Sequence, residues 1–242
     1  MGFLWAQVRD GFSLIAHGNA FLLSLVWVTV RVMLVSTAAA LLIGLPLGLG
    51  LGLGRFRGRR ALQVLANASL GLPPVVVGVV ALLLLVPQGP FGSLRIEFTI
   101  RALFVVQTIL ALPYIVALTT AAVQGLPPGL IAQARALGAG RRAQASLALR
   151  EAWVGVLAAV IAAAGTTVAE AGAVIIVGGN LEGRDSTLVG SLLLRFSTVP
   201  NDPFEAAIAM LILALIIILG GGLTLVQRRA GRPRLRFQEQ RA

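Results

Sequence analysis

One polar segment decides the fold: residues 124–152 read QGLPPGLIAQARALGAGRRAQASLALREA and separate two long apolar runs. The proline pair at 127–128 favours the start of a helix over residues 129–137. Glycines within 138–140 end that helix, and residues 141–150 predict a second short one. Because most connecting loops are only a few residues long, this helix–turn–helix predicts a docking surface for a soluble partner.

The sequence on both sides of this loop is apolar enough to cross a membrane. The chain is 57% hydrophobic and 12% charged, whereas soluble domains carry about 25% charged residues. A helical span needs about 20 apolar residues. Five stretches reach that length: residues 21–47, 61–86, 102–123, 153–177 and 204–226. The sequence therefore predicts an all-α membrane protein with about five transmembrane helices and one long cytoplasmic loop.

The chain divides into three expected parts. Residues 1–18 predict an interfacial segment, because its apolar side chains recur at helical spacing with polar residues elsewhere. Residues 19–227 form the transmembrane domain, including the loop at about 124–152, and residues 228–242 form a basic cytoplasmic tail. Residues 48–54, which alternate Gly and Leu, are expected to fray at the membrane surface.

Arginines set the expected orientation of the spans. The net charge is +11 and the chain contains no lysine, so all of its basic side chains except one histidine are arginines. Fourteen of the 20 arginines lie in the loops after the first and third spans and in the C-terminal tail. The positive-inside rule therefore places the C-terminus in the cytoplasm and the N-terminus outside. Arginines beside apolar runs indicate topology and give no reason to expect nucleic acid as a partner.

Prolines interrupt two of the expected spans. Pro73 and Pro74 lie about halfway along the second span, and Pro46 lies late in the first. Proline removes a backbone donor and clashes with the preceding turn, so each site predicts a kink. Interrupted backbone at membrane depth has to be buried in protein or line a cavity. A packing kink and a transport pathway both remain open for these sites.

Residues 132–138, AQARALG, resemble the EAA loop of ABC importer permeases. In that family Glu-Ala-Ala, three residues and a glycine form the coupling helix, which sits in a cleft of the ATP-binding subunit. Ala132 stands where the family has its glutamate, so a salt bridge from that position is not expected here. The resemblance implies a MetI-like permease fold and assigns four residues to ATPase coupling: Ala134, Arg135, Leu137 and Gly138.

Other motifs resemble the permeases of that family that carry oxyanions. They are LPPVVVG at 72–78, GPFGSL at 89–94 and ALP at 111–113. Residues 169–180, from AEAGA to VGGN, look most like tungstate-type permeases. The resemblance implies an importer for a tetrahedral oxyanion, with tungstate ranked ahead of molybdate, sulfate or another small anion.

Polar residues within the spans are the candidates for the substrate pathway. An ionised side chain at bilayer depth costs roughly 2.5–3.5 kcal/mol, so Arg31 and Glu170 should face protein or water. Arg31 could attract an oxyanion and Glu170 could act in a gate, whereas a structural ion pair or snorkelling would explain them without transport. Thr166, Thr167 and Asn180 could supply neutral hydrogen-bond donors, which pass an anion without trapping it.

The sequence has no catalytic or metal-binding pattern. It lacks the Lys-Ser/Thr ending of a phosphate-binding loop, contains no cysteine and has one histidine, His17. We therefore expect no enzyme activity and no cofactor on this chain, with ATP and Mg²⁺ used by a separate ATPase subunit.

The expected partners follow from the permease resemblance and from size. Five spans enclose too small a channel alone, so a second copy is expected to complete it. A cytoplasmic ABC ATPase dimer would dock on the loop, and an extracytoplasmic binding protein would deliver the substrate for alternating access. A secondary transporter is the alternative from another class, but the inverted repeats it would be expected to show are not evident.

Overall fold

The computed structural model describes residues 2–181, 184–198 and 202–230, and their regular structure is entirely helical. The helices are α1 (Gly2–Ala16), α2 (Ala20–Leu53), α3 (Arg59–Ser69), α4 (Pro74–Leu85), the 3₁₀ helix η1 (Gly92–Leu94), α5 (Ile100–Gln124), α6 (Leu130–Ala136), α7 (Arg141–Glu151), α8 (Trp153–Ala169), α9 (Gly172–Val177), α10 (Leu188–Thr198) and α11 (Pro203–Ala230). The predicted all-α class is confirmed. Most of the predicted basic tail lies outside the described residues.

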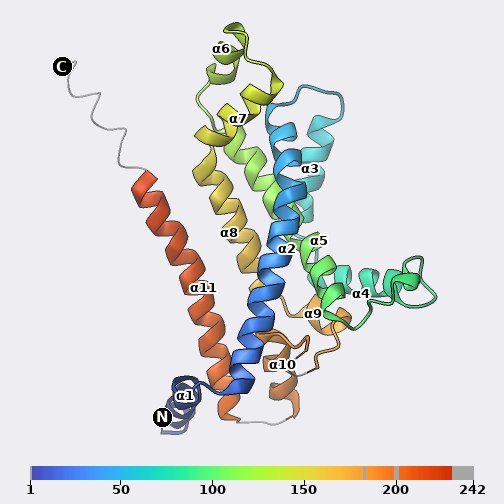
Figure 1. The fold of residues 1–242 in the computed structure, drawn as a ribbon, viewed down its shortest axis with the longest axis vertical. Helices are drawn as coiled ribbons and strands as arrows, with labels where there is room; N and C mark the ends of the chain where they lie inside the picture. The colour runs from blue at the N-terminus through green and yellow to red at the C-terminus, as the bar shows by residue number, and fades with distance from the viewer. Residues whose placement is uncertain (1, 182–183, 199–201, 231–242) are drawn as a thin grey trace, which may run out of the picture.

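Helices α2, α5 and α11 are each long and apolar enough to cross a membrane. The described chain has up to five spans if two bent helix pairs, α3 with α4 and α7 with α8, each count as one. Figure 1 shows α2, α5 and α8 side by side along the long axis. The loop helices α6 and α7 and the α2–α3 connection lie at one end, while α1 and α10 lie at the other. The two described loops that are rich in arginine therefore share one end of the molecule.

Glycines bring α2 and α5 into close contact. A Cβ added at Gly44, Gly48 or Gly52 would lie 2.6–2.8 Å from a side-chain atom of α5. At the end of α2, the guanidinium of Arg59 donates to the carbonyl oxygens of Leu51, at 2.6 Å, and Gly52, at 3.0 Å. The expectation that residues 48–54 fray is therefore wrong. The helix continues to Leu53 because its glycines pack and its last carbonyls are capped.

The second expected span is broken rather than kinked. Helices α3 and α4 meet at an angle of 102°. Pro73 adopts an extended conformation with φ −63° and ψ 119°, and Pro74 begins α4. A residue that precedes proline is driven out of the helical region, and proline itself suits the first turn of a helix. The proline pair thus ends one helix and starts another in a new direction.

The fourth expected span, residues 153–177, is also interrupted. Helix α8 ends at Ala169, Glu170 is extended with ψ 118°, and α9 begins at Gly172. The prediction of one continuous span here is wrong. The chain changes direction at Glu170 because its side chain, rather than a backbone carbonyl one turn earlier, accepts hydrogen bonds from the first amides of α9.

The N-terminal segment forms the predicted helix, α1, and packs on the start of α11. A Cβ added at Gly11 would lie 2.9 Å from the backbone nitrogen of Ala207. Trp5 and Phe12 on α1 are largely exposed, with 74% and 64% of their surface accessible. The helix is therefore held by protein on one face, and its position at a membrane interface stays a prediction.

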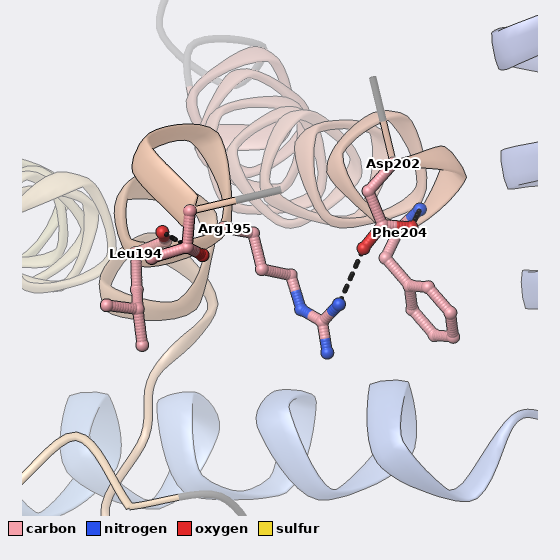
Figure 2. A network of polar contacts seen from close by, with 5 residues as sticks. Leu194, Arg195, Asp202 and Phe204 are labelled. Carbon is pink, nitrogen blue, oxygen red and sulfur yellow. Dashed lines mark hydrogen bonds and ion pairs between the residues drawn. The ribbon is translucent and has the colours of Figure 1, made fainter. Parts of the chain in front are cut away.

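An arginine holds three helices together at the end of the molecule that carries α1. Nη1 of Arg195, on α10, lies 2.6 Å from Oδ2 of Asp202, which immediately precedes α11 (Figure 2). The same guanidinium lies 4.6 Å from the ring centre of Phe21 on α2 and 4.9 Å from that of Phe204 on α11. Helix α10 itself was not predicted, since it lies between the fourth and fifth expected spans.

We expect Arg195→Gln to lower the melting temperature of the purified chain. The substitution leaves the mostly buried carboxylate of Asp202 without its charged partner, at a cost of about 1–3 kcal/mol. Arg9→Gln is the matched control, because the ion pair between Arg9 and Asp10 is exposed and such pairs contribute little. Equal melting temperatures for the two variants would contradict a clamping role for Arg195.

Candidate functional site

A cavity of about 160 Å³ lies where the two broken spans meet α5. Its walls come from the α3–α4 break, from α5 and from the end of α8: Ser69, Leu70, Leu72, Pro74, Leu110, Tyr114, Thr166, Ala169 and Glu170. Three of these residues carry hydroxyl groups and one carries a carboxylate. A cavity of this size holds several waters, so it can take a small ion with part of its hydration shell.

The side chain of Glu170 shapes one wall of this cavity by binding the backbone of the residues that follow it. Its Oε1 accepts hydrogen bonds from the amide nitrogens of Gly172, at 2.7 Å, and Ala173, at 3.2 Å. These are among the first amides of α9, which have no partner within the helix. Glu170 therefore fixes the direction of α9, and the charge of its carboxylate is partly offset by two donors.

The helices that follow the two breaks, α4 and α9, pack closely against each other. A Cβ added at Gly78 on α4 would lie 2.8 Å from Cα of Ala173 on α9. A Cβ added at Gly172 would clash with Cγ2 of Val75. Helices α4 and α9 therefore touch backbone to backbone. This contact buries Gly78 and Ala173, whereas residues 71–73 of the α3–α4 break are exposed on this chain.

The structure brings together two of the five predicted pathway residues, Thr166 and Glu170. Thr166 and Thr167 both donate to the carbonyl of Ala163, at 2.8 and 3.0 Å, but Thr167 is buried and does not line the cavity. Arg31 lies elsewhere on α2, exposed, with its guanidinium carbon 5.9 Å from the ring centre of Phe104. Its proposed attraction of an anion stays a prediction.

Asn180 belongs to a separate polar network that folds the segment before α10. Its Oδ1 accepts a hydrogen bond from the hydroxyl of Ser186 at 2.7 Å, and its backbone φ is +47°. The carboxylate of Asp185, which is 1% exposed, accepts from the amides of Gly179 at 3.2 Å and Leu181 at 2.7 Å. Asn180 thus has a structural role in this turn, and its predicted pathway role stays untested.

Ser69 and Tyr114 were not predicted for the site. Tyr114 is the only tyrosine of the chain and follows Pro113 inside α5, while Ser69 is the last residue of α3 before the proline pair. A hydroxyl within a few residues of a proline in an apolar run is the signal that could have identified both, since Tyr114 follows Pro113 directly and Ser69 lies four positions before Pro73. It is a weak signal, because it does not say which way the hydroxyl points.

The loop at residues 124–152 forms the two short helices that the sequence predicts. Gly138 has φ +86°, a conformation that favours glycine, and it turns the chain between α6 and α7. Ala148 and Ala152 pack with Val123 at the root of the loop. Of the four predicted coupling residues, Ala134 is half-buried, Arg135 is exposed and Leu137 is 89% exposed. A loop that is packed at its base and exposes a leucine side chain has the form of a docking surface.

Comparisons with known proteins agree with this arrangement. Residues 44–237 match the family described as "Binding-protein-dependent transport system inner membrane component". A probable anion ABC transporter permease protein from Haloferax volcanii is 38% identical over 210 residues, which cover 85% of this chain and 90% of that protein. The tungstate uptake system permease protein TupB from Peptoclostridium acidaminophilum is 25% identical over 213 residues, which cover 88% of this chain and 93% of that protein.

The fold is similar to that of a solved transporter. An inward-facing structure of the MetNI methionine ABC transporter aligns with a TM-score of 0.74 at 21% identity, covering 88% of this chain and 97% of the other. The predicted MetI-like permease fold is thereby confirmed. The matched residues include both helix breaks and the loop that carries α6 and α7. The chain belongs to the family of binding-protein-dependent transport system inner membrane components, the multi-pass permease subunits of ABC importers, which are not enzymes themselves.

Proposed function

We propose that this permease imports a tetrahedral oxyanion, with tungstate as the first-ranked substrate, through the cavity where its two broken spans meet. The observation that carries the proposal is the convergence of both breaks and three hydroxyl side chains on one cavity. Relatives named as anion and tungstate permeases support the substrate class. Molybdate and sulfate remain alternatives, since relatives at 27% and 28% identity carry those names.

The lining of the cavity suits passage of an anion better than tight binding. Hydroxyl groups donate hydrogen bonds without adding positive charge, and a pathway has to release what it binds. The hydroxyl groups of Ser69 and Thr166 donate to carbonyls of their own helices in this structure, so they have to rotate to donate to an anion. The carboxylate of Glu170 at the same wall opposes prolonged residence of an anion. High affinity would then belong to an external binding protein, which delivers the substrate at the end of the molecule that carries α10.

Transport requires partners beyond this chain. A second copy would complete the pathway by a two-fold arrangement, and an ATPase dimer would dock on the loop around Arg135 and Gly138. ATP and Mg²⁺ would be bound by that ATPase, with the loop and the C-terminus in the cytoplasm and the N-terminus outside. Closure of the ATPases would draw the loops together and change which side of the membrane the cavity faces.

A competition experiment tests the substrate assignment. Uptake of labelled tungstate is measured in vesicles that contain the complete importer, with molybdate or sulfate added outside in increasing amounts. We expect tungstate itself to compete at the lowest concentration. Stronger competition by molybdate or sulfate would overturn tungstate as the first-ranked substrate and leave the oxyanion class intact. If labelled tungstate is not taken up at all, there is no uptake for the three anions to compete with, and the oxyanion class itself would be overturned.

Thr166→Val is expected to reduce the rate of uptake about two- to tenfold, which corresponds to the net contribution of one hydrogen bond, about 0.5–1.5 kcal/mol. The change removes one hydroxyl from the cavity wall and keeps the shape of the side chain. Thr167→Val is the matched control, because Thr167 bonds the same carbonyl but does not line the cavity. Equal uptake rates for the two variants would place the pathway elsewhere.

A further inference from the structure

A second and larger cavity lies at the end of the molecule that carries the loop helices. Its volume is about 790 Å³, and it is an open cavity lined by the last two turns of α2, by residues 54–56, by Arg135 and by the start of α7. Apolar side chains of α2 and Phe56 form part of its wall. The polar part consists of Arg55, Arg135, Arg141 and Gln144, and the lining contains no acidic residue.

The arginines around this cavity differ in how they are held. Nη2 of Arg135 donates to Oε1 of Gln144 at 3.3 Å, and Nε2 of Gln144 donates to the carbonyl of Ala139 at 2.7 Å. Arg55 and Arg141 make no hydrogen bond or ion pair with any residue in the described part of the chain. By contrast, the nearby Arg59 uses its guanidinium to cap α2. Two guanidinium groups at this cavity are therefore available to a ligand.

The backbone of α7 adds to the positive character of the cavity. Helix α7 begins at Arg141, and its preceding residue, Gly140, provides no side-chain cap for the first amides. The N-terminus of a helix carries a partial positive charge from such amides. Arg141 and Gln144 on this first turn both line the cavity. The first turn of α7 and three arginines thus line one cavity, and no carboxylate lies in its lining.

Orientation in the membrane does not account for this convergence. Arginines that only fix topology need to lie on one side of the membrane, as Arg57 and Arg142 do without lining the cavity. Arg55, Arg135 and Arg141 come from two segments that are far apart in the sequence, and folding brings them to a single cavity. A binding site requires such convergence, whereas the positive-inside rule does not.

We propose that this cavity binds a tetrahedral oxyanion group at the cytoplasmic end, between α2 and the coupling loop. Planar guanidinium groups donate paired hydrogen bonds that match the oxygens of such a group. The group could arrive as a free ion or as the phosphate of a membrane lipid, whose acyl chains would meet the apolar wall. This site is separate from the cavity between the broken spans and does not depend on which substrate that cavity passes.

The absence of cysteine from the chain allows a direct accessibility test. Ala145 lies on α7 and lines the cavity, so Ala145→Cys places a single thiol there. The full chain is placed in nanodiscs of phosphatidylcholine, and the thiol is modified with a sulfonate-bearing or a trimethylammonium-bearing thiosulfonate. We expect the anionic reagent to react about tenfold faster than the cationic one, because a positive cavity concentrates anions.

Added sulfate or tungstate is expected to slow this modification. At ten times the dissociation constant of the ion, roughly a tenth of the sites are free, so the rate falls about tenfold. Arg55→Gln combined with Arg141→Gln should abolish both the charge preference and the protection. Arg57→Gln combined with Arg142→Gln removes the same charge from the same two segments without altering the lining, and it should preserve both effects.

Nanodiscs that also contain phosphatidylglycerol, whose phosphate is not neutralised by a choline cation as that of phosphatidylcholine is, distinguish the two sources of the oxyanion group. Protection by phosphatidylglycerol without added ions would identify a lipid phosphate as the occupant, whereas protection only by added sulfate or tungstate would identify a free ion. Either result supports the site if the protection is lost when Arg55→Gln is combined with Arg141→Gln. The proposal would be overturned if neither kind of nanodisc shows protection. It would also be overturned if Arg57→Gln combined with Arg142→Gln loses as much protection as the Arg55 and Arg141 double variant.

Discussion

Gly78→Val is expected to abolish uptake while the chain still binds its ATPase subunit. A Cβ at Gly78 would lie 2.8 Å from Cα of Ala173, so the first atom of the new side chain meets backbone rather than a movable side chain. Overpacking of this kind costs about 1–3 kcal/mol, and relief requires α4 and α9 to separate. Both broken spans would then shift at the cavity that we assign to transport. The loop that carries α6 and α7 lies at the other end of α5 and α8 from this contact and is not touched.

The measurement compares labelled tungstate uptake with co-purification of the ATPase subunit. Gly71→Val is the matched control, because Gly71 also lies in the break of the second span but its added Cβ would have its nearest neighbour at 3.6 Å. The control should transport at a rate close to that of the unmodified chain. Uptake that survives in Gly78→Val would mean that contact between the two broken spans is not required for transport.

Gly138→Val is expected to separate the permease from its ATPase. Gly138 has φ +86°, a conformation in which a β-branched residue is strongly disfavoured, and such strain costs about 1–3 kcal/mol. The turn between α6 and α7 would open, and the exposed Leu137 would lose its position on the docking surface. Co-purification of the ATPase subunit should fall, and ATP-driven uptake should fall with it.

Gly140→Val isolates the effect of backbone conformation. Gly140 lies two residues away and has ordinary extended backbone, with φ −68° and ψ 170°. An added Cβ meets no atom within 4 Å at either glycine, so crowding does not distinguish the two substitutions. The control should retain its ATPase subunit. Retention of the ATPase in Gly138→Val as well would contradict the assignment of this turn to coupling.

Local sequence signals were sufficient for the loop and for the helical class. Gly138 and the proline pair at 127–128 act on the backbone where they occur, so their effect can be predicted without knowledge of tertiary contacts. The same is true of long apolar runs, which predict α2, α5 and α11. Helix α10 was missed because it is short, and its burial against α2 and α11 depends on residues distant in the sequence.

The breaks in the second and fourth spans show where local signals are insufficient. Hydrophobicity is continuous across Glu170, so residues 153–177 satisfy the length of a span even though the helix stops there. The break is specified by a side chain that binds backbone amides and by close packing at Gly78 and Gly172, which no periodicity reports. For the same reason Tyr114 was missed, because which side of α5 faces the cavity is set by its neighbours.

The central claim is that ATP hydrolysis by a separate subunit drives an oxyanion through the cavity between the broken spans. Its most direct test is uptake of labelled tungstate into vesicles that contain this permease and its binding protein, with and without the ATPase subunit. The proposed mechanism predicts uptake that requires both the ATPase subunit and ATP. Equal uptake in vesicles that lack the ATPase subunit would contradict it.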